Sequence, residues 1–87
     1  MAYTVEFLKT AERELAALPK DTQRQIARKI DALRENPRPP GVKLLHGEER
    51  FYRLRVGEYR VIYSIEGKRL VILVIKIGHR KDVYKNL

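Results

Sequence analysis

The chain has 87 residues, 44% of them hydrophobic and 34% charged, which is typical of one globular domain with a modest core. Nineteen Lys and Arg residues against eleven Asp and Glu residues give a formal net charge of +8, and cysteine is absent. This composition excludes disulfides and thiolate zinc sites, and two histidines are too few for a metal site of their own. The N-terminus does not resemble a signal peptide, and the longest apolar run, 70–75, is too short for a membrane span. We therefore expect a single cytosolic domain over residues 1–87 that does not contact membranes.

The positive charge is concentrated in the C-terminal part of the chain. Residues 1–49 contain nine basic and eight acidic residues, whereas residues 50–87 contain ten basic and three acidic ones. Eleven of the nineteen cations are arginine, whose planar guanidinium can bind a phosphate through two parallel hydrogen bonds. A solvated basic surface would also keep a small protein soluble. The uneven distribution nevertheless favours a nucleic acid or an acidic protein as the partner.

The N-terminal half of the chain predicts one strand followed by two helices. Apolar residues alternate with polar or small ones over residues 3–7, which indicates a strand. Thr10 is the expected N-cap of a first helix that stops at Pro19. Asp21 is the expected N-cap of a second helix that ends before Pro37, because a residue preceding proline avoids the α region. A short connection between the two helices predicts an antiparallel hairpin.

Beyond a stiff connector at 38–41, the period of the apolar residues changes from 3.6 to 2. Three strands are predicted, over residues 51–56, 59–66 and 69–77. Tight turns at 57–58 and around Gly67 join them, and Gly78 is expected to end the last strand. The predicted fold is α+β: an N-terminal strand, an antiparallel helical hairpin on a mostly antiparallel four-stranded sheet, and a short C-terminal tail helix.

The turn at residues 57–58 determines which side chains share a face of the sheet. With Gly57 and Glu58 at its centre, Arg55 lies opposite Arg60, and alternation puts Arg53 on the same face. The residues between them should face the helices: Leu54, Val56, Tyr59, Val61 and Tyr63. A two-residue second turn would add an apolar floor to the arginine face, on which a base could stack: Val71, Leu73, Ile75 and Ile77. A three-residue turn would reverse that face.

Two directly opposed arginines repel each other, which proteins tolerate mainly where an anion resolves the conflict. Arg55 and Arg60 therefore indicate an anion site. The structural alternatives are that the arginines protect an edge strand or pair with nearby acids, namely Glu48, Glu49 or Glu66.

The tail adds further candidates. Arg80 and Tyr84 are four residues apart, so one helical turn would place them on the same side. His79 precedes Arg80 directly, and Lys81 follows it. A single histidine or tyrosine is more often a loop donor or a packing residue, so the interest of these side chains is their combination with Arg60.

Two segments carry a family resemblance: Tyr52-Arg-Leu-Arg-Val-Gly-Glu-Tyr-Arg-Val-Ile-Tyr63 and Ile77-Gly-His-Arg-Lys-Asp-Val-Tyr84. The chain also opens with Ala-Tyr in the first strand, ends its first helix in Leu-Pro-Lys and stops its second at Asn-Pro. With these features the sequence resembles, over almost its whole length, the RelE/ParE superfamily of toxins from type II toxin–antitoxin systems. The resemblance is to the RelE-like branch, the mRNA interferases.

The resemblance implies a cytoplasmic endoribonuclease that needs no metal or cofactor and cleaves mRNA, expected in the ribosomal A site. The sugar 2′-hydroxyl would be the nucleophile, and the products would be a cyclic phosphate and a 5′-hydroxyl. It also implies a small, acidic cognate antitoxin that folds on binding and forms a hetero-oligomer with the toxin. The alternatives are a ParE-like gyrase inhibitor without nuclease activity and a non-catalytic nucleic-acid-binding module.

The family's site residues match positions of this chain. The resemblance implies that Arg60 holds the scissile phosphate, Arg80 stabilises the transition-state charge, and Tyr84 orients the substrate or moves a proton. The basic residues expected to bind RNA are Arg53, Arg55 and Lys81. Some family members have lysine in the strand pair, and arginine almost never gives up its proton. The proton acceptor is then His79 or Tyr84, or catalysis rests on charge stabilisation and alignment.

Overall fold

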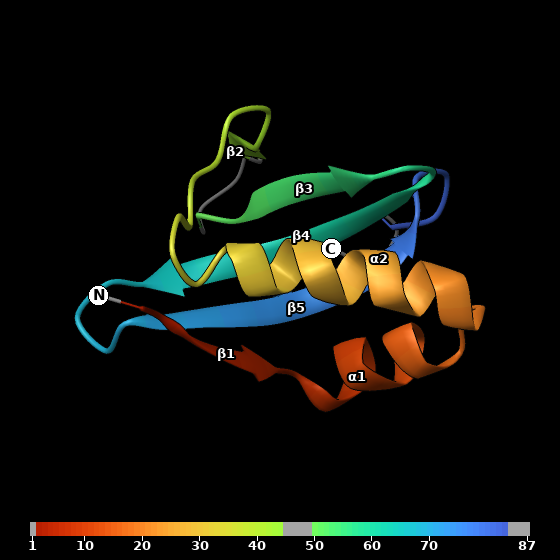
Figure 1. Ribbon diagram of the computed structural model, residues 1–87, viewed down its shortest axis with the longest axis horizontal. Coiled ribbons are helices and arrows are strands. Elements are labelled where there is room, and N and C mark those ends of the chain that lie inside the picture. The colour runs from red at the N-terminus through yellow and green to blue at the C-terminus, as the bar shows by residue number, and fades with distance from the viewer. Residues whose placement is uncertain (1, 45–49, 84–87) are drawn as a thin grey trace.

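The computed structural model describes residues 2–44 and 50–83, which contain two helices and five strands (Figure 1). The elements are β1 (Thr4–Phe7), α1 (Lys9–Ala16), α2 (Lys20–Ala32), β2 (Lys43–Leu44), β3 (Tyr52–Val56), β4 (Tyr59–Glu66) and β5 (Val71–His79). The strands form one sheet in the order β1-β5-β4-β3-β2, in which β1 runs parallel to β5 and the other pairs are antiparallel. The predicted α+β fold is confirmed. The sheet has one strand more than predicted, because two-residue β2 is too short to show an alternating pattern.

Both helices begin earlier than the predicted caps. The N-cap residues are Leu8 and Pro19, which have extended backbone angles and make no side-chain capping bond. Thr10 and Asp21 were wrong as N-caps, since each lies inside the first turn of its helix. Asp21 still places a negative charge at the positive end of α2, which is a favourable position for it.

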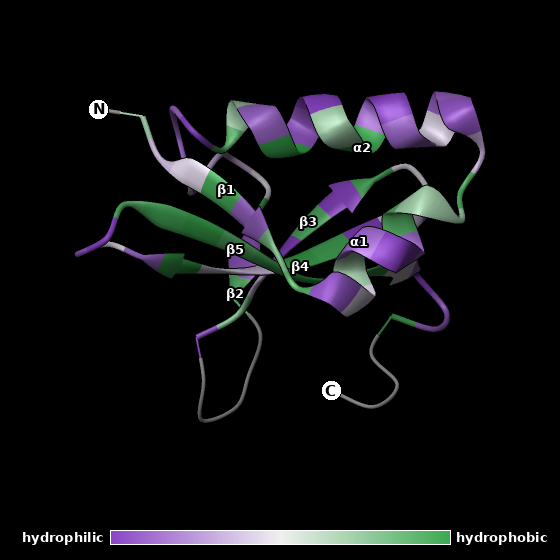
Figure 2. Cartoon of the chain, turned by 90° about the horizontal axis from the view of Figure 1, so that it is seen from below, coloured by the Kyte–Doolittle hydropathy of each residue, from purple (hydrophilic) through white to green (hydrophobic). Residues whose placement is uncertain are grey.

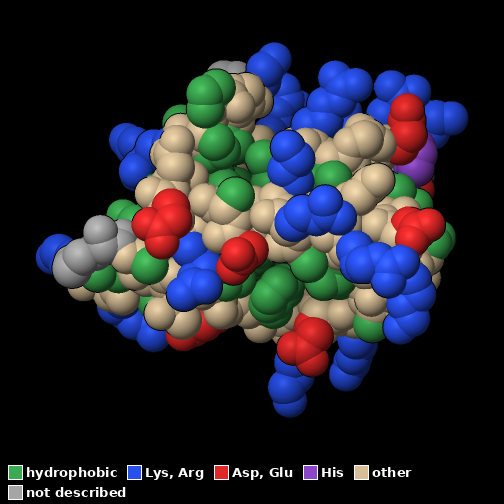
Figure 3. All heavy atoms as spheres, in the orientation of Figure 1, with side chains coloured by type: hydrophobic (Ala, Val, Ile, Leu, Met, Phe, Trp, Pro, Cys, Tyr) green, Lys and Arg blue, Asp and Glu red, His purple; other side chains and the backbone are tan. Residues whose placement is uncertain are grey.

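One face of the sheet is covered by helix and the other is not. Figure 2 shows α2 lying across one side of the sheet, with α1 next to the end of β1. The side of α2 that points away from the sheet faces the viewer in Figure 3 and carries Lys and Arg side chains. Among the described residues no helix covers the opposite face of the sheet, which we call the open face. No helix in the described part of the chain is long and apolar enough to cross a membrane.

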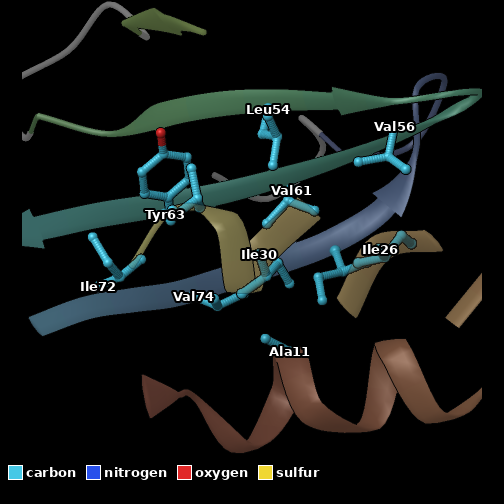
Figure 4. Packing of buried hydrophobic residues seen from close by; sticks show 11 residues of the cluster. Ala11, Ile26, Ile30, Leu54, Val56, Val61, Tyr63, Ile72 and Val74 are labelled. Carbon is cyan, nitrogen blue, oxygen red and sulfur yellow. The ribbon is translucent and has the colours of Figure 1, made fainter. Parts of the chain in front are cut away.

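The hydrophobic core lies between the helices and the covered face of the sheet. Buried side chains from both layers point toward one another (Figure 4): Ala11, Ile26, Ile30, Leu33, Leu54, Val56, Val61, Tyr63, Ile72, Val74 and Ile77. The Tyr63 hydroxyl donates a 2.7 Å hydrogen bond to the Pro37 carbonyl, and burial raises the pKa of Tyr63 to about 12. The ring of Tyr52 stacks on Tyr63, and Arg38 donates to the Tyr52 hydroxyl. These contacts attach the proline-rich connector to the sheet.

The strand register confirms the predicted arginine face. Arg55 pairs with Arg60 across the β3–β4 hairpin, and the residues predicted to face the helices belong to the core or pack on it. The β4–β5 loop spans 67–70, four residues rather than two, which keeps the predicted face because the number is even.

A β-bulge between Ile62 and Tyr63 corrects one residue of the predicted apolar floor. Val71 and Leu73 lie on the open face as predicted, but beyond the bulge the alternation of β5 is reversed. Ile77 therefore lies in the core, and Lys76 takes the open face opposite Ile62. A sequence pattern of strict alternation cannot reveal an inserted residue.

The tail turns back on the end of the sheet. Gly78 does not end the last strand, which continues to His79. The Val83 amide then donates to the His79 carbonyl at 2.9 Å, and the fully buried Val83 side chain packs beside Gly78. The short tail helix was predicted within residues 79–87; residues 80–83 form a turn and not a helix, and residues 84–87 lie outside the described residues.

Candidate nucleic-acid interface

Basic side chains occupy two neighbouring cross-strand rows on the open face. One row runs from Arg53 through Ile62 to Lys76, and the next from Arg55 through Arg60 to Gly78. Lys43 of β2 pairs with Arg53 and extends the first row. The fold thus brings together cations from four strands in two rows that are two residues apart along β3.

The guanidinium of Arg60 is fixed by the turn that precedes it. Its Nη1 donates to the carbonyl oxygens of Gly57, at 3.1 Å, and Tyr59, at 2.9 Å. Gly57 has a positive φ of 59°, a conformation that glycine adopts without strain, and this lets the chain make the tight turn. Carbonyls orient a guanidinium without neutralising it. Arg60 is therefore half-buried and positioned, and it keeps its full positive charge for an anion.

Arg80 is held by the same turn. Its backbone amide donates to the Glu58 carbonyl at 2.8 Å, and its Nε lies 2.9 Å from Oε2 of Glu58. Both side chains are more than half exposed, at 54% and 60%, so this ion pair stabilises the fold by only about 0–1 kcal/mol. Residues 57–59 thus contact both arginines that the sequence singled out.

His79 is placed on the other side of the sheet from Arg60. It pairs with Tyr59 in the strand register, and the two rings meet edge to face with 5.8 Å between their centroids. Its Nδ1 accepts a 3.2 Å hydrogen bond from the Lys81 amide. The structure therefore separates His79 from the open-face arginines and gives it a part in shaping the tail turn. Lys81 itself is exposed.

The other predicted RNA-binding residues lie on the open face. Arg55 is exposed and Arg53 is half-buried. Lys76, which the sequence assignment missed because of the bulge, lies 3.2 Å from Oε2 of Glu14. The other carboxylate oxygen of Glu14 accepts from the Ile77 amide at 3.0 Å, so α1 caps the edge of β5 beyond the end of β1.

The structural alternatives for the arginines are partly tested. Glu66 pairs with Arg69 at 2.7 Å and not with an arginine of the open face. Glu48, Glu49 and the candidate Tyr84 fall outside the described residues. Within residues 2–44 and 50–83, no group of three or more His, Asp or Glu side chains is placed to hold a metal ion.

Residues 5–84 match the family model described as ParE toxin of type II toxin–antitoxin system, parDE. The chain belongs to this toxin family. Putative toxin RelE1 from Methanocaldococcus jannaschii is 33% identical to the toxin over 99% of both chains. The mRNA interferase toxin RelE from Escherichia coli K12 is 32% identical over 97% of this chain and 92% of its own. The predicted RelE/ParE membership is confirmed.

Solved structures give the same assignment. A chain of the archaeal RelE–RelB complex from Pyrococcus horikoshii OT3 superimposes on the toxin with a TM-score of 0.82 and 35% identity, covering 95% of this chain and 100% of that chain. A chain of the intact E. coli RelBE toxin–antitoxin complex gives a TM-score of 0.80 at 28% identity, covering 90% and 96%. Both of these structures are complexes with a second protein.

Proposed function

We propose that the toxin is a metal-independent endoribonuclease that cleaves mRNA, in the ribosomal A site, and so inhibits translation. The observation that carries this proposal is the attachment of Arg60 and Arg80 to one turn, residues 57–59, at the end of a basic sheet face. Two oriented guanidinium groups suit a phosphoryl centre whose negative charge grows in the transition state. The relatives named mRNA interferase support the same activity.

In the proposed reaction the RNA itself supplies the nucleophile. The 2′-oxygen attacks the adjacent phosphorus, the bond to the 5′-oxygen breaks, and the products are a 2′,3′-cyclic phosphate and a 5′-hydroxyl. The 2′-hydroxyl loses a proton and the leaving 5′-oxygen gains one. Arg60 would hold the phosphate and Arg80 would stabilise its charge, while Arg53, Arg55 and Lys81 bind the strand. Since His79 lies across the sheet from Arg60, Tyr84 is the remaining side chain proposed to move a proton.

The same face implies a protein partner. Several relatives of known structure are complexes of RelE with RelB, described as toxin–antitoxin complexes, and others are the isolated RelE toxin. An acidic antitoxin that folds on the basic open face would neutralise the charge of that face and block RNA from reaching it. We therefore propose a cognate antitoxin and a toxin–antitoxin hetero-oligomer for this chain.

One observation favours a second candidate function. The matching family model is described by ParE and not by RelE, and the fold accommodates both kinds of toxin. A gyrase inhibitor would act through a protein surface and would leave RNA intact.

The two functions are separated by adding the purified toxin to a translation reaction and to a gyrase supercoiling reaction. The proposed nuclease cuts the translated mRNA and leaves supercoiling unchanged. The double variant Arg60→Ala, Arg80→Ala should be folded and inactive, whereas Arg24→Ala, on the helical layer, should cleave like the wild type. Translation arrest by the folded double variant would refute the proposed site. Loss of supercoiling with intact mRNA would establish the gyrase alternative.

A further inference from the structure

A groove runs between α2 and the outer part of the sheet, next to the open face. One hollow of about 680 Å³ lies between the C-terminal part of α2, the connector and β3. A second of about 680 Å³ continues along β3 to Gly57. The two share Lys29, Ala32 and Arg55, so they form one continuous surface. We call it the α2–β3 groove. Each hollow falls in the range of ligand sites, roughly 300–1,000 Å³, and has room for a nucleotide.

The lining of this groove carries charge of one sign. Its described lining residues include no Asp or Glu and six cations: Arg28, Lys29, Lys43, Arg53, Arg55 and Arg60. Figure 3 shows Lys and Arg side chains gathered along the upper edge of the molecule, over β3 and the β3–β4 turn. A concave surface of one sign attracts an oppositely charged polymer and concentrates its field.

The cations on and next to α2 differ in whether they form an ion pair. Arg24 of α2 pairs with Asp21, and Arg34, two residues beyond the end of α2, pairs with Asp31. Arg28 and Lys29, which line the groove, are exposed and have no ion pair within the described part of the chain. Cations without a carboxylate partner keep their charge for an external anion. Lys20, the first residue of α2, is also exposed and has no ion pair with a described residue, but it does not line the groove. In the C-terminal half of α2, both cations without an ion pair line the groove.

The groove is also continuous with the proposed site. Arg53, Arg55 and Arg60 line it and belong to the open face as well. β2 pairs only with residues 52–53 of β3, so no strand of the described chain covers the edge of β3 from Leu54 onward. Ala32, Pro39 and Pro40 give the groove accessible apolar surface, against which a ribose or base can pack while phosphates meet the cationic rim.

We propose that the α2–β3 groove binds the single-stranded RNA that flanks the cleaved phosphate, with Arg28 and Lys29 as its phosphate contacts on α2. This inference rests on the proposed function and adds the course of the strand outside the active site. RNA fits better than an acidic peptide because the cations follow the whole groove and lead without interruption to Arg60, as a chain of evenly spaced phosphates requires.

RNA length and salt test the groove. The double variant Arg28→Ala, Lys29→Ala is compared with Lys20→Ala, Arg24→Ala, which removes the same charge from the same helix outside the groove. Binding is measured on the Arg60→Ala background, which slows cleavage, with RNAs of about four and about sixteen nucleotides, the range of single-strand site sizes. For the long RNA, the groove variant should lower the slope of log affinity against log salt by about 1.4, or about 0.7 for each lost contact. The short RNA should bind equally to both variants.

The outcomes separate this inference from the proposed function. If the salt slopes for the long RNA agreed between the groove variant and the control, RNA binding by the groove would be overturned. The proposed nuclease activity would be unaffected by that result. Failure of the protein to bind RNA of either length would overturn both. If the groove variant bound an acidic antitoxin peptide more weakly but bound RNA as before, the groove would be a site for the protein partner and the RNA path would be overturned. Because Arg28 and Lys29 are exposed, the thermal melting curve of each variant should match that of its background.

Discussion

The two faces of the sheet are built from the same strands and have opposite properties. Along β3 and β4, alternate residues are buried against the helices, as with Leu54 and Val61. The residues between them lie on the open face and include the paired arginines Arg55 and Arg60, next to the fully buried Ile62. Because side chains alternate along a strand, a single segment can supply half of a core and half of a binding surface. Changes on the two faces should therefore affect different measurements: unfolding on the covered face, and RNA cleavage on the open one.

The largest effect is expected from a cavity in the covered face. Ile72 is fully buried, and Ile72→Ala removes apolar contacts that the packed surroundings cannot fully replace. The free energy of unfolding should fall by about 2–5 kcal/mol, measured by urea denaturation. Arg55→Ala, on the open face, is the matched change and should stay within about 0.5 kcal/mol of the wild type. Equal losses from both would contradict the division between the faces.

Removing the positioned charge on the open face should mainly affect chemistry. Arg60→Ala deletes a guanidinium that two turn carbonyls orient. Cleavage of mRNA on ribosomes should fall roughly a hundredfold, as is typical when a preorganised charge partner is lost. Its unfolding free energy should change by less than about 1 kcal/mol, because carbonyls at an exposed turn can bond water instead. If Arg60→Ala were strongly destabilised but cleaved mRNA at the wild-type rate while folded, Arg60 would have a structural role and not a catalytic one.

The Tyr63 hydroxyl is a polar group on the covered face, and its loss should have an intermediate effect. Tyr63→Phe leaves the Pro37 carbonyl without its donor and should cost about 1–3 kcal/mol of stability. Burial raises the Tyr63 pKa from 10.0 to about 12, so folding favours the neutral phenol. That contribution is fully present below pH 10.0 and is lost as the pH rises through about 12. The Tyr63→Phe variant has no phenol to ionise, so the unfolding free energies of the two proteins should converge across this pH window.

The smallest effect is expected where an exposed ion pair touches the site. Glu58→Gln removes the carboxylate beside Arg80 and keeps the backbone bond from the Arg80 amide to residue 58. Stability should change by less than about 1 kcal/mol. RNA affinity at low salt should rise by a few-fold, because one negative charge has left the basic surface. Glu12→Gln, on α1, is the control, and an equal rise in that variant would show that only net charge matters.

Local sequence was enough to predict much of this protein. Alternation with a two-residue turn at Gly57 and Glu58 determined the pairing of Arg55 with Arg60, since register follows from turn length in a hairpin. Ile26 and Ile30 are four residues apart, a spacing that puts them on one side of a helix, and both are buried in the core. Charge counting located the basic half of the chain, and two short motifs identified the toxin family.

The remaining features depend on contacts between segments far apart in the chain. The bulge that moves Ile77 into the core and Lys76 onto the open face follows from how β5 fits between its neighbours, and alternation alone does not encode it. The attachment of Arg80 to Glu58 joins the tail to a turn about twenty residues earlier. The α2–β3 groove likewise joins a helix to a strand that is distant along the chain. The sequence by itself determined which residues carry charge and which residues of β3 and the first part of β4 belong to the core. Beyond the Arg55–Arg60 pair of the hairpin, only tertiary packing decided which charges meet, because those distances depend on the whole fold.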